Sequence, residues 1–150
     1  MPSKSLVELG QSDYSRYGED KIGHKYSYIY DILFKPLQDQ PVNIFEIGFF
    51  NGGSIRLWLD YFKLPTIRAI DINPFCLPMA ENMLLVYPNF KLGIMSSNDL
   101  TPDYFKDFSP DIVIDDGSHI LADQLHVVKV IYPILKSGAY LIIEDVANLE

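Results

Sequence analysis

Two apolar segments of the chain end in residues that could bind a metal. The segment "DIVIDDGSH" contains Asp115, Asp116 and His119, and "YLIIEDV" contains Glu144 and Asp145. If both segments are neighbouring parallel strands, the two acidic pairs lie side by side, about 4.8 Å apart. Crowded carboxylates repel one another, and a hard divalent cation such as Mg²⁺ or Ca²⁺ relieves that repulsion through oxygen ligands. The pairs therefore predict a metal site; the alternative is that they cap the helices that follow.

A histidine follows the first acidic pair. His119 lies three residues after Asp116, across a Gly-Ser turn. Imidazole binds many metals, but beside an oxygen-rich Mg²⁺ site a histidine is more useful as a general base. We therefore predict catalytic roles for His119 and Asp116. The other two histidines have weaker cases: His126 is expected to be structural, and His24 could line a substrate entrance.

A glycine-containing segment, "EIGFFNGGS", joins an apolar segment to a predicted helix. Gly48 permits a tight turn, and Gly52 and Gly53 allow a ligand to approach backbone amides at a helix N-terminus. The G-x-x-x-G spacing differs from the G-x-G-x-x-G of dinucleotide-binding proteins, so a pyrophosphate-binding loop is not favoured. Glu46 is placed to meet a cationic or hydroxylated ligand, and Ser54 lies near the helix start. The alternative is an ordinary strand–turn–helix connection.

An aspartate ends the next apolar segment, "AIDI". Asp71 follows Gly48 by about 20 residues, the spacing at which an acidic residue typically accepts hydrogen bonds from ribose hydroxyls. The alternative is a surface or helix-capping aspartate. Together with the glycine segment, Asp71 favours a pocket for a nucleotide-type cofactor next to the metal site.

The strand and helix patterns place these residues at one edge of a sheet. Strand-length apolar segments alternate with segments of helical period, which is typical of a doubly wound, Rossmann-like α/β fold. Such a fold has a parallel sheet, here of about five strands, with helices on both faces. Ligands bind it at the carboxyl ends of the strands. The predicted strands are 42–48, 66–72, 90–95, 111–116 and 139–145. The predicted helices are 52–63, 78–87, 102–108 and 121–136, and Pro133 should end or kink the last of them.

The segment before the first strand has a different pattern. Residues 18–37 carry apolar and aromatic side chains at helical spacing, which predicts one helix that packs on the sheet. We therefore expect a single domain overall. It consists of an N-terminal helical segment over residues 1–41 and a cofactor-binding, Rossmann-like domain over residues 42–150.

Length, charge and composition narrow the possible partners. A chain of 150 residues fits one domain, and its net charge of −8 makes it a poor partner for nucleic acid. No apolar segment approaches the roughly 20 residues that span a bilayer, so no membrane partner is expected. The N-terminus lacks the apolar stretch of a signal peptide. A single cysteine suits a reducing compartment, and we expect a cytoplasmic protein.

Four motifs together resemble a known family. They are "DK…HKYSYIYDILF", "FEIGFFNGGSIRLWLDYF", "IRAIDIN" and "DIVIDDGSH…DQ…YPILKSGAYLIIEDV", and they extend over residues 18–147. This pattern resembles the class I S-adenosylmethionine (SAM)-dependent methyltransferases. Within them it is most similar to the metal-dependent sugar O-methyltransferases of the macrocin and mycinamicin type, and to the related cephalosporin hydroxylase and rhamnosyl O-methyltransferase group.

The resemblance implies the role of each motif. The implied SAM contacts are Glu46, Gly48, Gly52, Ser54, Asp71 and Asp115. Such proteins usually carry an acidic turn after the third strand. Here the chain reads "GIMSSND", so one of Ser96, Ser97 and Asp99 takes its place, and Ser97 is the predicted contact. The implied Mg²⁺ ligands are Asp116, Glu144 and Asp145. His119 is the implied base that removes the proton of the hydroxyl to be methylated.

The resulting expectation is a SAM-dependent, Mg²⁺-assisted O-methyltransferase for a sugar or another vicinal-diol small molecule. One alternative is an NAD-type oxidoreductase, which the glycine spacing disfavours. Another is a truncated or non-catalytic scaffold of the same fold, because the full fold normally continues with antiparallel strands that this chain lacks. The fifth strand would then be an exposed edge, which predicts self-association into a homo-oligomer.

Overall fold

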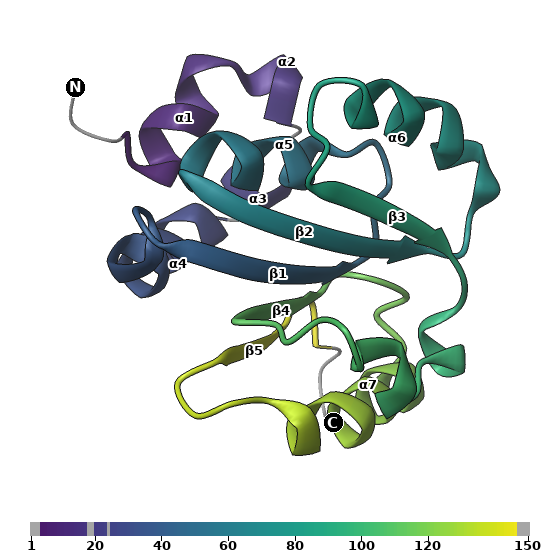
Figure 1. Cartoon of the computed structure of the whole chain (residues 1–150). Coiled ribbons are helices and arrows are strands. Elements are labelled where there is room, and N and C mark those ends of the chain that lie inside the picture. The colour runs from purple at the N-terminus through teal and green to yellow at the C-terminus, as the bar shows by residue number, and fades with distance from the viewer. Residues whose placement is uncertain (1–3, 18–19, 24, 147–150) are drawn as a thin grey trace. The chain divides into compact units, whose positions relative to one another are not determined.

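The computed structural model describes residues 4–17, 20–23 and 25–146 (Figure 1). The chain divides into two compact units. The helical unit comprises Met1–Val42 and Asn51–Pro65, and the sheet unit comprises Asn43–Phe50 and Thr66–Glu150. Helix α5 (Gly53–Tyr61), expected within the Rossmann-like part, therefore groups with the N-terminal helices. The expected boundary between residues 41 and 42 stays a prediction.

The described residues form one five-stranded sheet of order β3-β2-β1-β4-β5. The pairs β1–β4, β2–β3 and β4–β5 are parallel. The strand order reverses between β1 and β4, and ligands bind at such a switch point in doubly wound folds. The predicted Rossmann-like class is confirmed, as is the pairing of the two strands that end in acidic residues. The strands are β1 (Pro41–Ile47), β2 (Leu64–Asp71), β3 (Phe90–Ile94), β4 (Ile112–Asp115) and β5 (Tyr140–Ile143).

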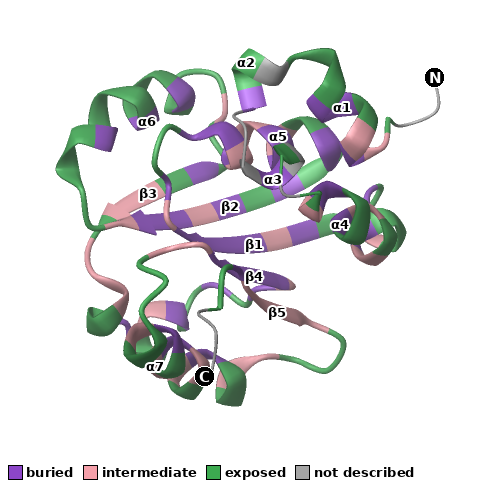
Figure 2. Cartoon of the chain, turned by 180° about the vertical axis from the view of Figure 1, so that it is seen from behind, coloured by how far each residue is buried: buried purple, intermediate pink, exposed green. Residues whose placement is uncertain are grey.

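Alternating strand residues build the core of the sheet unit. Phe45 of β1 is in register with Val113 of β4, and both pack against Val127 and Ile131 of α7 (Leu121–Ile131). Helix α6 (Leu77–Leu84) lies on the opposite face of the sheet (Figure 2). Both helices thus bury their apolar sides on the sheet, and the first turn of α7 is held beside the carboxyl ends of β4 and β5.

Two predicted helices are shorter in the structure than in the prediction. The short helix predicted over 102–108 is a 3-10 helix over its first four residues only, η4 (Pro102–Phe105). The α-helix predicted over 121–136 ends at Ile131 and continues as η5 (Tyr132–Ile134), which confirms that Pro133 ends it: proline has no backbone N–H and its ring clashes with the preceding turn. The other short 3-10 helices of the sheet unit are η2 (Pro74–Cys76) and η3 (Ser97–Asp99).

The helical unit is more broken than the sequence pattern predicts. The prediction of a single helix over 18–37 is wrong, because Lys25 adopts a left-handed conformation (φ 62°) immediately before α4 (Tyr26–Phe34). The aromatic rings of Tyr30, Phe34 and Trp58 then pack together, with centroids 5.2 to 5.9 Å apart. The remaining elements of this unit are α1 (Leu6–Ser12), α2 (Tyr14–Tyr17), α3 (Asp20–Gly23), α4 (Tyr26–Phe34) and η1 (Lys35–Leu37).

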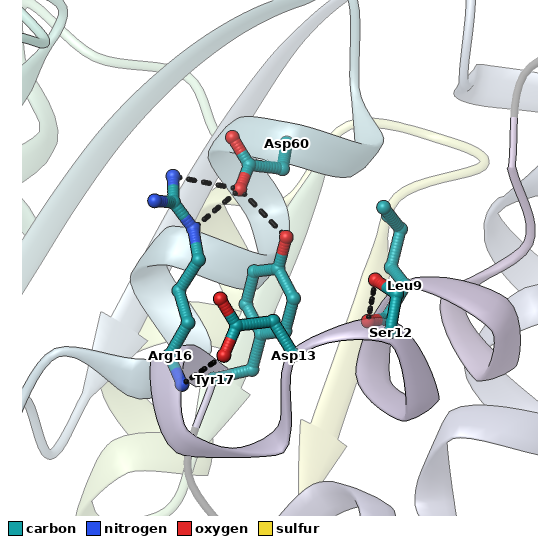
Figure 3. Close-up of polar contacts among 6 residues, drawn as sticks. All are labelled: Leu9, Ser12, Asp13, Arg16, Tyr17 and Asp60. Atoms are coloured by element: carbon teal, nitrogen blue, oxygen red, sulfur yellow. Dashed lines mark hydrogen bonds and ion pairs between the residues drawn. The ribbon is translucent and has the colours of Figure 1, made fainter.

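A polar cluster joins α2 to α5 within the helical unit (Figure 3). The Tyr17 hydroxyl donates to Asp60 Oδ2 at 2.8 Å, and Arg16 Nε donates to the same oxygen at 3.0 Å. Burial, together with the hydrogen bond to Asp60, raises the pKa of Tyr17 to about 12. The tyrosine is therefore protonated near neutral pH and remains a donor to the carboxylate.

Removing this hydroxyl should destabilise the helical unit. Tyr17→Phe keeps the ring but leaves Asp60 without one donor, so we expect the free energy of unfolding to fall by about 1–2 kcal/mol. Urea denaturation followed by circular dichroism measures the change. Tyr28→Phe is the control, because Tyr28 is exposed. Equal stability of Tyr17→Phe and Tyr28→Phe would show that the cluster contributes nothing.

Candidate functional site

Three side chains gather where β4 and β5 end. Asp116, His119 and Asp145 each offer a ligand atom, and these atoms lie within 4.8 Å of one another. His119 Nε2 is 4.0 Å from Asp116 Oδ1. Two of the predicted metal ligands and the predicted base thus lie together at the carboxyl edge of the sheet.

Strand ends and tight turns position this group. Asp116 directly follows β4, and its amide donates to the carbonyl oxygen of Ile47 at 2.9 Å. The chain then turns back, and His119 adopts a left-handed conformation (φ 56°). After β5, Asp145 also has a positive φ of 50°. A non-glycine residue in this region costs roughly 1–2 kcal/mol, so both loops need support from neighbouring groups.

The other two acidic residues of the pairs are buried. Glu144 is not part of the group within 4.8 Å, although its backbone amide donates to the Asp115 carbonyl at 2.9 Å. Asp115 ends β4, and its Oδ1 accepts the Gly117 amide at 3.2 Å. Burial raises the pKa of Asp115. After each strand the structure thus has one buried acidic residue and one more accessible one: Asp116 is partly buried and Asp145 is exposed.

The glycine turn after β1 lies against the metal-site loop. Gly48 has φ 95°, and a Cβ built on it would lie 2.2 Å from the carbonyl oxygen of Asp116. Only glycine therefore fits where β1 meets the loop that carries Asp116. Glu46 lies two residues before Gly48 and is wholly buried. It follows Phe45, the β1 residue that packs on α7. Its predicted contact with a cofactor stays a prediction.

Asp71 holds the glycine turn through backbone hydrogen bonds. Its Oδ2 accepts the amides of Phe49 at 2.8 Å and Phe50 at 2.9 Å, and its Oδ1 accepts the Asn73 amide at 2.8 Å. Asp71 therefore has a structural role that the sequence pattern did not predict. A carboxylate has about four acceptor sites, so the predicted ribose contact stays compatible with these bonds.

Two predicted cofactor residues belong to the helical unit. Gly52 has φ 73° and precedes α5, and Ser54 lies in the first turn of that helix. A Cβ on the intervening Gly53 would lie 2.3 Å from the Tyr17 carbonyl oxygen. The two glycines of the motif thus have different roles: Gly52 adopts the left-handed conformation of the turn, and Gly53 lets α2 approach the backbone closely.

The remaining candidates lie on other loops. Ser97 begins η3, which the Ser96 hydroxyl caps by accepting the Asn98 amide at 3.2 Å. His126 lies on α7 with its Nε2 3.2 Å from the Leu100 carbonyl oxygen, which agrees with the structural role expected for it. His24 lies outside the described residues.

Three polar residues that contact the site loops were not predicted. They are Asn98, Asp123 and Gln124. The letters "DQ" at positions 123–124 stand at the start of α7, but nothing in their local spacing shows which loops they contact.

Comparisons with known sequences identify the relatives. No protein-family model matches the chain. The 8-demethyl-8-alpha-L-rhamnosyl tetracenomycin-C 2'-O-methyltransferase of Streptomyces olivaceus is 32% identical over 143 residues, which cover 87% of this chain and 35% of that protein. The mycinamicin VI 2''-O-methyltransferase of Micromonospora griseorubida is 29% identical over 141 residues, covering 87% and 34%. The chain thus spans about a third of the length of the curated relatives it matches.

The chain is also similar to solved structures of methyltransferases. The MycE methyltransferase of the mycinamycin biosynthetic pathway, solved in complex with Mg and SAH, matches with a TM-score of 0.74 at 25% identity. The match covers 94% of this chain and 39% of that one. The chain therefore has the Rossmann-like methyltransferase fold. Within that class, the resemblance to the sugar O-methyltransferases predicted from the motifs is confirmed.

The described helices also bear on the membrane prediction. Among them, none has the length and apolar character that crossing a bilayer requires.

Proposed function

We propose that the chain is the methyltransferase domain of an enzyme that uses SAM and Mg²⁺ to methylate a hydroxyl of a sugar or another vicinal-diol small molecule. The observation that carries this proposal is the group formed by Asp116, His119 and Asp145. It lies beside the glycine turn at the switch point of the sheet. Similarity to MycE, which was solved with Mg and SAH, supports it.

The donor set fits a hard divalent cation. Carboxylate oxygens are ligands that Mg²⁺ prefers, and the ligand atoms that Asp116, His119 and Asp145 offer lie within 4.8 Å of one another. We assign Asp116 and Asp145 as ligands. Glu144 stays a predicted third ligand, and its buried side chain would have to move toward the group. Bound Mg²⁺ would supply positive charge that orients the acceptor hydroxyl and lowers its pKa.

His119 is the proposed general base. Its side chain is 43% exposed, so an acceptor hydroxyl can approach the imidazole. A neutral imidazole nitrogen accepts the hydroxyl proton, and Asp116, 4.0 Å from Nε2, stabilises the imidazolium that results. SAM would supply the methyl group. The contribution of these residues is to place the hydroxyl and remove its proton.

SAM binding tests the cofactor part of the proposal. Asp71→Ala removes the predicted ribose acceptor and the support of the glycine turn. We therefore expect at least about a 10-fold loss of SAM affinity, the equivalent of one hydrogen bond to a charged group. Isothermal titration of SAM into the folded chain measures the affinity.

Asp103→Ala is the control. Asp103 lies on η4, is exposed, pairs with Lys106 and is not a predicted site residue. If the folded wild-type chain binds no SAM, the proposed function fails for this chain. If Asp71→Ala binds SAM as tightly as Asp103→Ala does, the ribose assignment fails.

The sugar-like acceptor is proposed from the relatives, because the name of the tetracenomycin methyltransferase specifies a rhamnosyl substrate. Self-association through the edge of β5 and a cytoplasmic location stay predictions.

A further inference from the structure

The first turn of α7 contacts both loops that carry the metal-site group. We infer that this turn is the positioning element of the site: Asp123 fixes the loop of Asp116 and His119, and Gln124 fixes the end of β5 that carries Asp145. The inference rests on the proposed function, because it concerns the same metal site.

Asp123 acts through hydrogen bonds on both sides of His119. The Ser118 hydroxyl donates to Asp123 Oδ2 at 2.6 Å, and the Ile120 amide donates to the Ser118 hydroxyl at 3.3 Å. The Asp123 amide in turn donates to the Ile120 carbonyl at 3.0 Å. His119, with its positive φ, lies between two residues that are both tied to Asp123. These bonds offset the cost of the left-handed conformation, which would otherwise relax and carry the imidazole away.

Asp123 also links this loop to the one after β3. Asn98 Nδ2 donates to Asp123 Oδ1 at 2.8 Å, so each carboxylate oxygen holds a different loop. Asn98 follows Ser97, the predicted cofactor contact, on η3. The hydrogen bonds from Ser118 and Asn98 hold the pKa of Asp123 below its usual value, so the carboxylate is ionised and accepts from both donors.

Gln124 performs the equivalent task for β5. Its side chain is buried, and Nε2 donates to the Glu144 carbonyl oxygen at 3.1 Å. The Glu144 amide donates to Asp115 at the end of β4. Both backbone polar groups of Glu144 are thus fixed, one by the neighbouring strand and one by α7. The direction in which the chain leaves β5, and with it the position of Asp145, is set by these two bonds.

The turn is a rigid support, because α7 is anchored in the core of the sheet unit through Val127 and Ile131. Residues that orient metal ligands typically change metal affinity by 10- to 100-fold when they are removed. Asp123 and Gln124 should therefore affect metal binding, although neither belongs to the ligand group itself.

Titration with Mn²⁺ tests the inference without requiring catalysis. Mn²⁺ accepts the same oxygen-rich ligand sets as Mg²⁺, and the electron paramagnetic resonance signal of the free ion reports its binding. We expect Asp123→Ala, Gln124→Ala and the similarly sized Gln124→Glu each to weaken Mn²⁺ binding 10- to 100-fold. Ser118→Ala should show part of the Asp123→Ala effect, and Ser118→Thr, which keeps the hydroxyl, should restore the affinity.

Matched controls in the helical unit separate positioning from general destabilisation. Gln38 is also buried, and its Nε2 donates to the Lys4 carbonyl at 2.8 Å. Asp13 likewise accepts a serine hydroxyl, from Ser15 at 2.9 Å. Gln38→Ala and Asp13→Ala should therefore lower stability in a comparable way and leave Mn²⁺ affinity unchanged.

Two results would overturn the inference. If the folded wild-type chain binds no Mn²⁺, the proposed metal site fails and the positioning role fails with it. If the wild type binds Mn²⁺ but folded Asp123→Ala and Gln124→Glu bind it as well as the two controls do, the metal site stands and the positioning role is wrong. Gln124→Glu and Asp123→Ala together keep the test decisive even if Gln124→Ala does not fold.

Discussion

Gly48→Ala is expected to lower the free energy of unfolding by about 2–5 kcal/mol, the sum of backbone strain and a steric clash. Gly48 has φ 95°, where a side chain is strained, and the new Cβ would lie 2.2 Å from the Asp116 carbonyl oxygen and 2.9 Å from its carbonyl carbon. Both contacts are with backbone, so no side-chain rotation can relieve them. Urea denaturation of the purified variants measures the change.

Two other glycines separate the strain from the clash. Gly138 has a similar φ of 85°, but a Cβ there meets nothing within 4 Å, so Gly138→Ala reports backbone strain alone. Gly23 has open space and no positive φ, so Gly23→Ala should be close to neutral. We expect Gly48→Ala to be clearly worse than Gly138→Ala. A similar loss of unfolding free energy in these two variants would mean that the loop of Asp116 shifts at little cost and relieves the clash.

A loop that shifts to admit the methyl group would also move Asp116. The same variant should therefore weaken Mn²⁺ binding, provided that it folds. The connection follows from topology: the ends of β1 and β4 meet at the switch point of the sheet, so the glycine turn and the metal-site loop share one boundary.

The sheet was the most predictable part of the molecule. Buried parallel strands appear in the sequence as short apolar runs, and the observed strands lie within the predicted ones or within two residues of their ends. The acidic residues after β4 and β5 were predicted to lie together because parallel strands end at the same edge. The structure confirms this for Asp116 and Asp145.

The helical unit was less predictable, for two different reasons. The break before α4 depends on a left-handed lysine, Lys25, which no local pattern indicates. Helix α1, in contrast, has a readable signal that the sequence interpretation missed: Ser5 and Glu8 form a capping box, with Ser5 accepting the Glu8 amide and Glu8 accepting the Ser5 amide.

The supports of the site could not be predicted from local sequence. Asp123 contacts Asn98, 25 residues away, and Gln124 contacts the carbonyl of Glu144, 20 residues away. Each bond forms only because α7 packs on the sheet with its first turn beside the carboxyl ends of the strands. Motif spacing identifies residues that touch a ligand, whereas residues that hold those ligands in place depend on tertiary packing.

Asp116→Asn is expected to reduce Mn²⁺ affinity by at least about 100-fold, more than the loss of a residue that only orients a ligand. The amide keeps the size of the side chain but removes its charge from a group that contains a second carboxylate, Asp145. Asp111→Asn is a matched control. Asp111 precedes β4 at its other end, where it pairs with Lys136, so its loss should leave Mn²⁺ affinity unchanged.

The stability of Asp116→Asn relative to the wild type should depend on whether metal is present. Without metal, neutralising one of two close carboxylates relieves their repulsion, so the variant should be at least as stable as the wild type. With Mn²⁺ at 100 times the wild-type dissociation constant, the wild type should gain about 2.7 kcal/mol through linkage, and the variant should gain far less. A thermal melt with and without Mn²⁺ measures both effects. An equal Mn²⁺-induced shift in the two proteins would place the metal elsewhere and remove Asp116 from its ligands.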